Sequence, residues 1–452
     1  MFGSVGMVNP NAISDISVDK LFGEYTYEIP GPNMDQSDIS KLLIMYGGNG
    51  SGKTTILQLL YHILSPARKE GHRTYLARQS FRKIAVRLAD GMSIVAERKG
   101  SELDGSFTWS ISREEEVLAE VYLQANADKA IPGKLSDEVE SKHDEVIAAL
   151  TDRNIQLYFL SDDRKILGRT EDEDSEFAEY ALVREEIGER VISTRRILRD
   201  KSHGLPLDEA IDDLVKWIRN QVFTASSLGE TNVNTIYSEV IKSIAELPSS
   251  ENTITHDSIK QLLDTMKNLA KKNQEFSDLG LLPPLNVEAI VTILKKPHTE
   301  TEAIIYNILR PYVDGIKARF DALEEIKNLI NTFIYNLNYF YVGKRARFDL
   351  SQGLRLTSHI GQDLSIGMLS SGEKQLLLLF CHTLVAREQS SIVIIDEPEI
   401  SLNVTWQRQL IRALLECAAG SNFQLILATH SMELLTQHKQ QVSKLINLAI
   451  SA

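Results

Sequence analysis

The segment from Gly47 to Thr54, GGNGSGKT, matches the pattern G-x-x-x-x-G-K-[ST] and constrains the fold more than any other part of the chain. The apolar run LLIMY precedes it and the amphipathic segment TILQLLYHIL follows it, so we expect a buried strand, a tight loop and a helix. Glycines let consecutive backbone N–H groups surround a polyphosphate at the positive end of such a helix. The sequence therefore predicts an α/β nucleotide-binding core; a glycine-rich turn without a ligand is the alternative.

Two residues of this loop carry the predicted chemistry. Lys53 is expected to reach the β- and γ-phosphate oxygens of ATP, and the Thr54 hydroxyl is expected to bind Mg²⁺. The full set predicted to contact the nucleotide from this side is Gly47, Gly48, Asn49, Gly50, Ser51, Gly52, Lys53, Thr54 and Thr55. ATP and Mg²⁺ are thus the expected cofactors.

A second apolar run, SIVII at 391–395, ends in two carboxylates, Asp396 and Glu397. At the carboxyl edge of a parallel sheet, beside the phosphate loop, such groups lie where a metal ion belongs. We predict that Asp396 holds Mg²⁺ together with Thr54. The adjacent Glu397 leaves the strand in another direction, so we assign it as the general base that faces the attacking water.

The run LILAT at 425–429 is a third predicted strand, and His430 follows it. Taken alone, a histidine at the end of a strand is more often a packed edge residue than a functional one. A third parallel strand beside the other two would bring His430 to the γ-phosphate side of the site. Glu397, Lys53 and His430 are therefore the predicted catalytic residues.

Hydrophobic periodicity divides the rest of the chain. Short alternating segments at 13–30 and 81–113, with a hairpin turn at 89–91, predict an antiparallel β lobe. Helical spacing then dominates, including a helix behind Pro206 and a long helix through 305–337 that is expected to kink at Pro311. We predict three parts: 1–165, a helical insertion at 166–344 that is compact rather than a long coiled-coil arm, and 345–452, where alternation resumes.

Charge, cysteines and hydropathy restrict the partners. A net charge of −13 disfavours a surface that is basic overall, so nucleic acid would need a local basic patch. Cys381 and Cys417 lie in apolar stretches and are expected to be core thiols of a reduced, cytoplasmic protein. The longest apolar run, 376–386, is far short of the ~18 residues of a membrane span, so no membrane segment is expected.

Two groups of basic residues are candidates for such a patch, with solvated faces as the alternative for both. The first is Arg68, Lys69, His72, Arg73, Arg78, Arg82, Lys83 and Arg87. The second is Arg195, Arg196, Arg199 and Lys201.

Taken in order, the phosphate loop, LSSGE at 369–373, the pair Asp396–Glu397, EISLN at 399–403 and His430 resemble the Walker A, signature, Walker B, D-loop and switch-histidine motifs of ABC-type ATPases. The chain is most similar to the RecF, SMC and OLD-like branch, including ATPase subunits of bacterial anti-phage defence systems such as Gabija, Septu and PARIS. This resemblance covers about 1–165 and 345–452. It implies an α/β P-loop ABC-type ATPase head, a mixed sheet with an antiparallel β lobe, interrupted by a mainly helical insertion.

The resemblance also implies a use for the serine-rich signature, which has none in its own ATP site. In ABC-type ATPases the signature of one subunit completes the ATP site of another, so Ser370 and Gly372 would contact a γ-phosphate held by Lys53 of the partner subunit. The nucleotide contacts implied from this side are Ser370, Ser371, Gly372, Glu373 and Asn403. The implied assembly is a homo-oligomer of at least two heads bound head to tail around ATP; an ordinary helix N-cap by Ser370 or Ser371 is the alternative.

Some positions depart from the family pattern or stay open. The signature reads LSSGE rather than LSGGQ, and Asn403 stands where many relatives have Asp or His. Asp162 and Arg164 are candidates for the lid loop, whereas Gln79 comes too early. Tyr25 or Tyr27 would stack on adenine or, alternatively, pack within a strand.

Three functions fit these features. The first is an enzyme, an ATPase forming ADP and phosphate, that acts as the sensor subunit of a bacterial anti-phage system and controls a separately encoded nuclease or toxin. About twenty residues follow His430, so we expect no C-terminal nuclease and a partner protein as the output. The second is a RecF/SMC-like DNA-binding ATPase in DNA repair. The third, a scaffold that binds ATP without hydrolysing it, is disfavoured by Glu397 beside Asp396.

Overall fold

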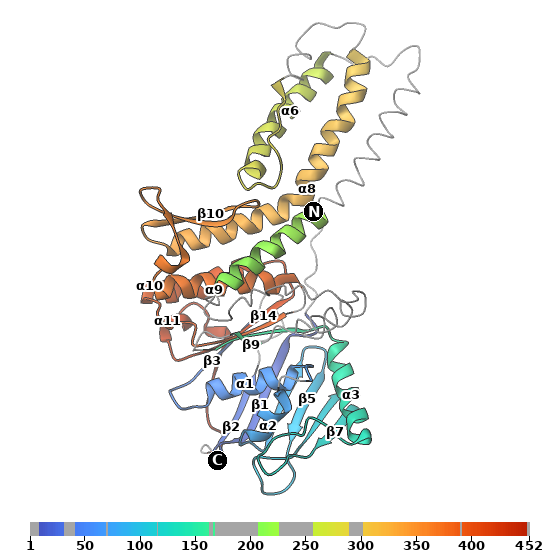
Figure 1. The fold of residues 1–452 in the computed structure, drawn as a ribbon, viewed down its shortest axis with the longest axis vertical. Coiled ribbons are helices and arrows are strands. Elements are labelled where there is room, and N and C mark those ends of the chain that lie inside the picture. Colours follow the sequence, from blue (N-terminus) through green and yellow to red (C-terminus); the bar gives the residue numbers. More distant parts are fainter. Residues whose placement is uncertain are drawn as a thin grey trace, which may run out of the picture. The chain divides into compact units, whose positions relative to one another are not determined.

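The computed structural model describes residues 9–30, 41–68, 71–114, 116–161, 166–167, 207–225, 256–288, 302–388 and 391–449 (Figure 1). The chain forms two compact units, Met1–Pro206 together with His382–Ala452, and Leu207–Cys381. The two units are described one after the other. The boundaries predicted from the sequence, 165/166 and 344/345, stay a prediction.

A mainly parallel sheet forms the centre of the first unit. Its strand order among the described residues is β15–β3–β14–β13–β8–β9, and only β9 is antiparallel to its neighbour. All seven residues of β14 are buried, which explains its continuous apolar run. The strands are β3 (Leu42–Tyr46), β8 (Gln156–Leu160), β9 (Ile166–Leu167), β13 (Ser391–Asp396), β14 (Phe423–Thr429) and β15 (Val442–Lys444).

A second sheet of this unit is the antiparallel lobe, with the order β2–β1–β4–β5–β6–β7. The turn predicted at 89–91 joins β4 to β5, and Gly91 supplies its positive φ of 84°. The sequence analysis did not identify β7. The strands are β1 (Ile13–Leu21), β2 (Tyr25–Pro30), β4 (Lys83–Leu88), β5 (Met92–Glu97), β6 (Phe107–Arg113) and β7 (Glu116–Leu123).

Helices cover these sheets and join them through one core. Ile56 and Leu60 of α1 belong to a buried cluster that contains Ile394 and Ile426 of the parallel sheet and Ile94 of the lobe. Helix α3, which the sequence analysis missed, packs against β7 (Figure 1). The helices are α1 (Lys53–Leu64), α2 (His72–Arg78), α3 (Asp137–Thr151), α10 (Val404–Cys417) and α11 (Met432–Leu435), with 3-10 turns at Ala386–Glu388 and Lys439–Gln441.

The second unit is mainly helical, as predicted, with one small sheet. Helix α6 (His256–Ser277) packs against the long α8 (Glu302–Phe340), where Phe276 stacks on Phe320 at 4.9 Å. Pro311 lies inside α8, and a further helix spans 207–225. The antiparallel strands are β10 (Lys344–Asp349), β11 (Gly353–Ser358) and β12 (Asp363–Leu364), and a 3-10 turn (Ile366–Met368) leads to α9 (Ser371–Val385).

The predicted fold class is therefore confirmed: a P-loop α/β head with an antiparallel β lobe, interrupted by a mainly helical segment. Both cysteines are buried free thiols, as expected. Within the described residues, no helix combines the length and apolar character that crossing a membrane requires.

The first predicted basic patch is wrong as a continuous surface. His72 and Arg73 are buried, and the Arg73 guanidinium stacks over the Trp109 ring at 3.5 Å. Arg68 and Lys83 pair with Asp144 and Glu97, respectively. Lys69 and the second patch lie outside the described residues.

Candidate functional site

The phosphate loop lies between β3 and α1, and its shape depends on a glycine. Gly52 has a φ of 83°, in the left-handed region that residues with a side chain rarely adopt. A Cβ atom at this position would lie 2.8 Å from Leu21 Cδ2, so the lobe strand β1 leaves no room for one. Tyr27 of β2 donates a hydrogen bond from its hydroxyl to Ser51 O at 2.9 Å. The β lobe thus holds the loop from the side.

Lys53 is buried, and every polar contact of its ammonium group lies within the predicted site. Its Nζ donates to Gly47 O at 3.1 Å and Gly48 O at 3.2 Å, and lies 3.4 Å from Glu397 Oε1. A buried ammonium needs such partners because burial without them is costly. The same donors can serve the phosphates of a nucleotide in the loop.

The order of the parallel strands brings the other predicted residues to the same edge. β14 lies between β3 and β13, so residues that follow these strands meet beside the phosphate loop. Thr54 Oγ1 donates to Asp396 Oδ2 at 2.6 Å. Glu397 Oε2 contacts Nδ1 of His430. Lys53, Thr54, Asp396, Glu397 and His430 are therefore brought together, although they come from three distant segments.

The backbone at Glu397 turns away from the strand, whereas the sequence predicts only that its side chain leaves in a different direction from that of Asp396. Glu397 has a φ of 48°, and its N–H still donates to Ala428 O at 2.9 Å. This left-handed conformation sends the Glu397 side chain toward Lys53 and His430, while Asp396 contacts Thr54. The two neighbouring carboxylates thus have separate environments: Asp396 lies beside Thr54, and Glu397 lies beside Lys53 and His430.

The Thr54–Asp396 pair fits Mg²⁺. Mg²⁺ prefers oxygen ligands, usually one or two protein groups together with phosphate oxygens and water. Thr54 Oγ1 and Asp396 Oδ2 are two such oxygens already in contact, at the first turn of α1, and Asp396 is buried. These two residues would hold the ion, which supplies positive charge against the phosphates.

Sequence reasoning missed Glu399 as a site residue. Its carboxylate is buried, and its Oε1 accepts hydrogen bonds from the Thr429 hydroxyl, from His430 N at 3.2 Å and from Ser431 N at 3.1 Å. Burial raises the pKa of the Glu399 carboxyl, and the nearby Glu397 acts in the same direction, against the hydrogen bond from Thr429. The only sequence signal was a third carboxylate in DEPE.

The signature residues lie in the second unit, where they form a capping box at the start of α9. Ser370 N donates to Glu373 Oε2 at 2.7 Å, and Glu373 N donates to Ser370 Oγ at 3.3 Å. Lys344 Nζ lies 2.7 and 2.6 Å from the two oxygens of Glu373. Burial pushes the pKa of Glu373 upward, but the hydrogen bonds from Lys344 and Ser370 outweigh it and leave this pKa lowered. The Glu373 carboxylate therefore already has partners, whereas Ser370 and Ser371 are exposed.

Other predicted positions have structural partners as well. Asn403 caps α10, because its Oδ1 accepts from Trp406 N at 3.0 Å. Tyr27 is buried beneath the phosphate loop, as the strand-packing alternative expects, and Tyr25 stacks on it at 5.8 Å. Gln79 follows the end of α2. Asp162 and Arg164 lie outside the described residues.

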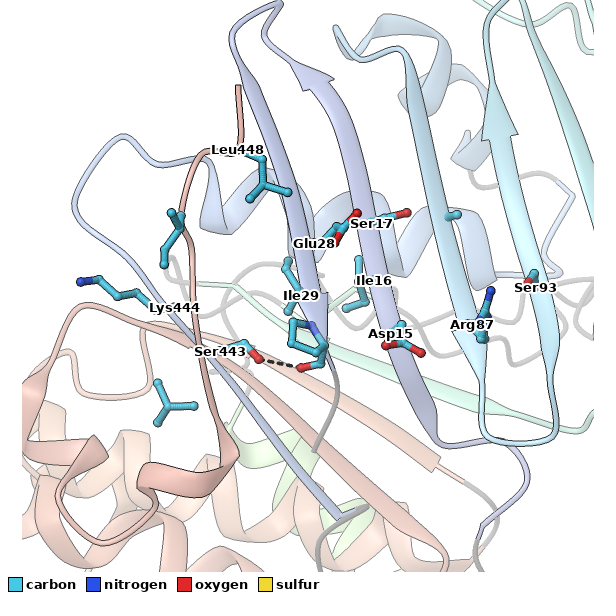
Figure 2. A pocket seen from close by; sticks show the side chains of 14 residues that line it. Asp15, Ile16, Ser17, Glu28, Ile29, Arg87, Ser93, Ser443, Lys444 and Leu448 are labelled. Atoms are coloured by element: carbon cyan, nitrogen blue, oxygen red, sulfur yellow. Dashed lines mark hydrogen bonds between the residues drawn. The ribbon is translucent and has the colours of Figure 1, made fainter. Parts of the chain in front are cut away.

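A pocket of about 740 Å³ lies elsewhere in the first unit, between the outer face of the β lobe and the C-terminal strand. Figure 2 shows Glu28, Arg87 and Ser93 on the lobe strands, and Lys444 and Leu448 on the C-terminal segment beside them. None of the residues predicted to contact the nucleotide or the metal lines it. This pocket is therefore separate from the predicted nucleotide site at the phosphate loop.

Two solved structures match almost the whole chain: an Smc head domain with an extended coiled coil bound to the C-terminal domain of ScpA, derived from Pyrococcus furiosus (14% identity, 97% of this chain and 96% of that chain, TM-score 0.37), and an Smc head bound to the C-winged helix domain of ScpA (12%, 96% and 97%, 0.36). We draw nothing further from them at these TM-scores. No curated protein matches the sequence.

A family model described as AAA ATPase domain matches residues 35–435, a range that contains the phosphate loop, both carboxylates and the histidine. The chain belongs to this family of AAA ATPase domains.

Proposed function

We propose that the protein is an ATP-hydrolysing switch in which two copies bind head to tail around ATP and control a separate effector protein, a nuclease or toxin of a bacterial anti-phage system. The observation that carries the hydrolysis is the contact chain from Lys53 through Glu397 to His430, beside the Thr54–Asp396 pair. Phosphoryl transfer to water needs a base for the water and positive charge beside the phosphates. Glu397 is the carboxylate for the first role and Lys53 the cation for the second.

The hydrolytic step follows from the contacts of Glu397. Phosphate oxygens of ATP are stronger acceptors for Lys53 than the carbonyls of Gly47 and Gly48, so ATP draws the ammonium toward itself. Glu397 then loses one ionic partner and keeps His430. Its carboxylate accepts a proton of the water as the water oxygen bonds to the γ-phosphorus and the bond from that phosphorus to the β–γ bridging oxygen breaks. ADP leaves with the bridging oxygen, and Lys53 stabilises the negative charge that develops there.

Exposed apolar side chains next to the motifs support a composite site made by two copies. Phe22, which flanks Gly52, Val404, which follows Asn403, and Met432, which follows the His430 loop, are 45%, 50% and 62% exposed. Met368, one residue before the signature, is 63% exposed. Large apolar side chains at such positions favour burial against another protein surface. A second head that supplies Ser370, which is exposed, would cover them; Gly372, the other residue expected to contact the phosphate, is buried.

A RecF/SMC-like DNA-binding ATPase is the second candidate, favoured by one specific feature of the second unit. Arg345, Arg347 and Arg355 are exposed, and Arg347 lies directly opposite Arg355 in the β10–β11 register. Like charges directly opposite one another destabilise a sheet. Asp363 already pairs with Arg355 at 2.8 Å, so the exposed Arg345 and Arg347 are the two that a phosphate backbone would contact.

The test is a pulldown of tagged Glu397→Gln protein from its native host with ATP and Mg²⁺, in which bound protein and nucleic acid are both identified. A stoichiometric protein partner without DNA supports effector control and identifies the output. DNA without a protein partner would refute effector control and favour the second candidate. Lys53→Ala protein, treated identically, is the control for binding that does not depend on nucleotide.

A further inference from the structure

Glu399 is the one buried carboxylate of the site for which the hydrolytic step above gives no role. It neither contacts Lys53 nor belongs to the Thr54–Asp396 pair. Its side chain is only 5% exposed, and its Oε1 accepts hydrogen bonds from three consecutive residues, Thr429, His430 and Ser431. A carboxylate that is costly to bury is thus used to hold one short loop.

The loop held by Glu399 is the one that carries His430. The His430 side chain is about half exposed and contacts Glu397 through Nδ1, with Glu399 Oε1 at 3.5 Å from the same atom. Side-chain packing therefore does little to fix the imidazole, and the backbone of residues 429–431 determines where it lies. The hydrogen bonds to Glu399 fix this backbone.

A second contact connects the same two segments. Ser431 Oγ donates to Gln407 Oε1 at 2.8 Å, and Gln407 Nε2 donates to Leu402 O at 2.9 Å. Leu402 N in turn donates to Glu399 O at 3.0 Å. The 399–403 segment and the 429–431 loop are thus joined twice, through the buried Glu399 carboxylate and through the Gln407 side chain.

We propose that Glu399 is a positioning residue: it ties the 399–403 segment to the His430 loop and so keeps His430 against Glu397 during hydrolysis. This inference rests on the proposed hydrolytic function of Glu397.

The experiment measures single-turnover ATP hydrolysis and ATP affinity for Glu399→Leu and Glu399→Gln. Leucine removes the acceptor of three hydrogen bonds, so hydrolysis should fall roughly 10- to 100-fold with little change in ATP affinity. Glutamine retains a carbonyl acceptor and should restore most of the rate. Glu433→Gln is the matched control and should behave like wild type, because Glu433 is a partly exposed carboxylate near the His430 loop that pairs with Arg408.

A double-mutant cycle separates positioning from a general loss of structure. In a His430→Ala background, Glu399→Leu should cost no further activity, because the tie acts through His430. Additive losses would overturn the proposal. If Glu399→Leu does not fold, Thr429→Val, which removes one donor at nearly constant volume, takes its place in the same cycle.

The two proposals fail in different ways. A wild-type rate in Glu399→Leu, with Glu397→Gln inactive, would refute the tie and leave the proposed function intact. An unchanged rate in Glu397→Gln would refute the hydrolytic assignment itself.

Discussion

The phosphate-loop site and the signature satisfy their polar groups in opposite ways. At the phosphate loop, Thr54 pairs with Asp396 and Lys53 pairs with Glu397. The two members of each pair are more than 300 residues apart in sequence. At the signature, Ser370 and Glu373 satisfy each other within one helical turn, and Lys344 neutralises the carboxylate.

The difference indicates what each region can offer a ligand. The contacts of Lys53 with carbonyls and Glu397 can be exchanged for those with a phosphate, so the first region is built to be rearranged by ATP. The contacts of Glu373 hold a helix start in place, so the second region is a rigid surface that presents Ser370 and Ser371. The proposed composite site would combine the two, with exchangeable contacts at the phosphate loop of one copy and a fixed helix start at the signature of the other.

The largest effect is expected from Glu397→Gln. Without the general base, ATP hydrolysis should fall by roughly 10²- to 10⁴-fold while ATP still binds and the closed oligomer accumulates. Phosphate release and light scattering measure the two quantities. Glu416→Gln, on the surface of α10, is the matched control. Equal rates in Glu397→Gln and wild type would mean that another group activates the water.

Lys53→Ala should act on binding instead. The loss of a charge-assisted contact with the phosphates should lower ATP affinity by roughly 10- to 100-fold, and activity should disappear. Titration calorimetry measures the affinity, with Lys129→Ala, an exposed lysine paired with Asp104, as the control. Wild-type ATP affinity in Lys53→Ala would show that Lys53 does not contact the phosphates and would contradict the assignment of the phosphate loop.

Lys344→Met tests the rigid side of the comparison. It leaves the buried Glu373 carboxylate without its ammonium partner, so the Ser370 loop should shift and hydrolysis should fall roughly tenfold at unchanged ATP affinity. Arg345→Met should have no such effect, because Arg345 follows Lys344 in β10 and its side chain lies on the exposed face. Equal behaviour of the two variants would show that the capping box does not need Lys344.

Gly52→Ala tests the phosphate loop through the stability of the fold rather than through a rate. The methyl group meets Leu21 at 2.8 Å and the backbone is left-handed, so we expect a loss of about 2–4 kcal/mol from strain and contact together. Gly71→Ala has a similar φ of 73° but open space around it, so it should show only the conformational part, about 1–2 kcal/mol. Chemical denaturation measures the free energy of unfolding of both variants. Equal losses would show that the Leu21 side chain moves aside at no cost.

The site could be predicted from sequence where a functional residue follows an apolar run. Asp396, Glu397 and His430 each end or follow a buried strand, and parallel strands bring such ends together. Glu399 was missed because its role depends on a loop 30 residues away, and Lys344 because it lies 29 residues before Glu373. No local pattern encodes either contact.

Two elements of the fold were also missed, because their sequence patterns were obscured. Strand β7 was missed because Val117, Leu118 and Tyr122 point outward and hide the alternation. Helix α3 did carry a signal, since His143, Val146, Ile147 and Leu150 are buried at helical spacing, but its many charged residues obscured it.

Mixing two inactive variants tests the composite site most directly. Lys53→Ala lacks a working phosphate loop and keeps its signature, whereas Ser370→Arg lacks a working signature and keeps its phosphate loop. If the signature of one copy completes the ATP site of the other, a mixed dimer contains one intact site, and ATP hydrolysis should return when the two proteins are mixed. A mixture that is no more active than the sum of its parts would contradict the composite site.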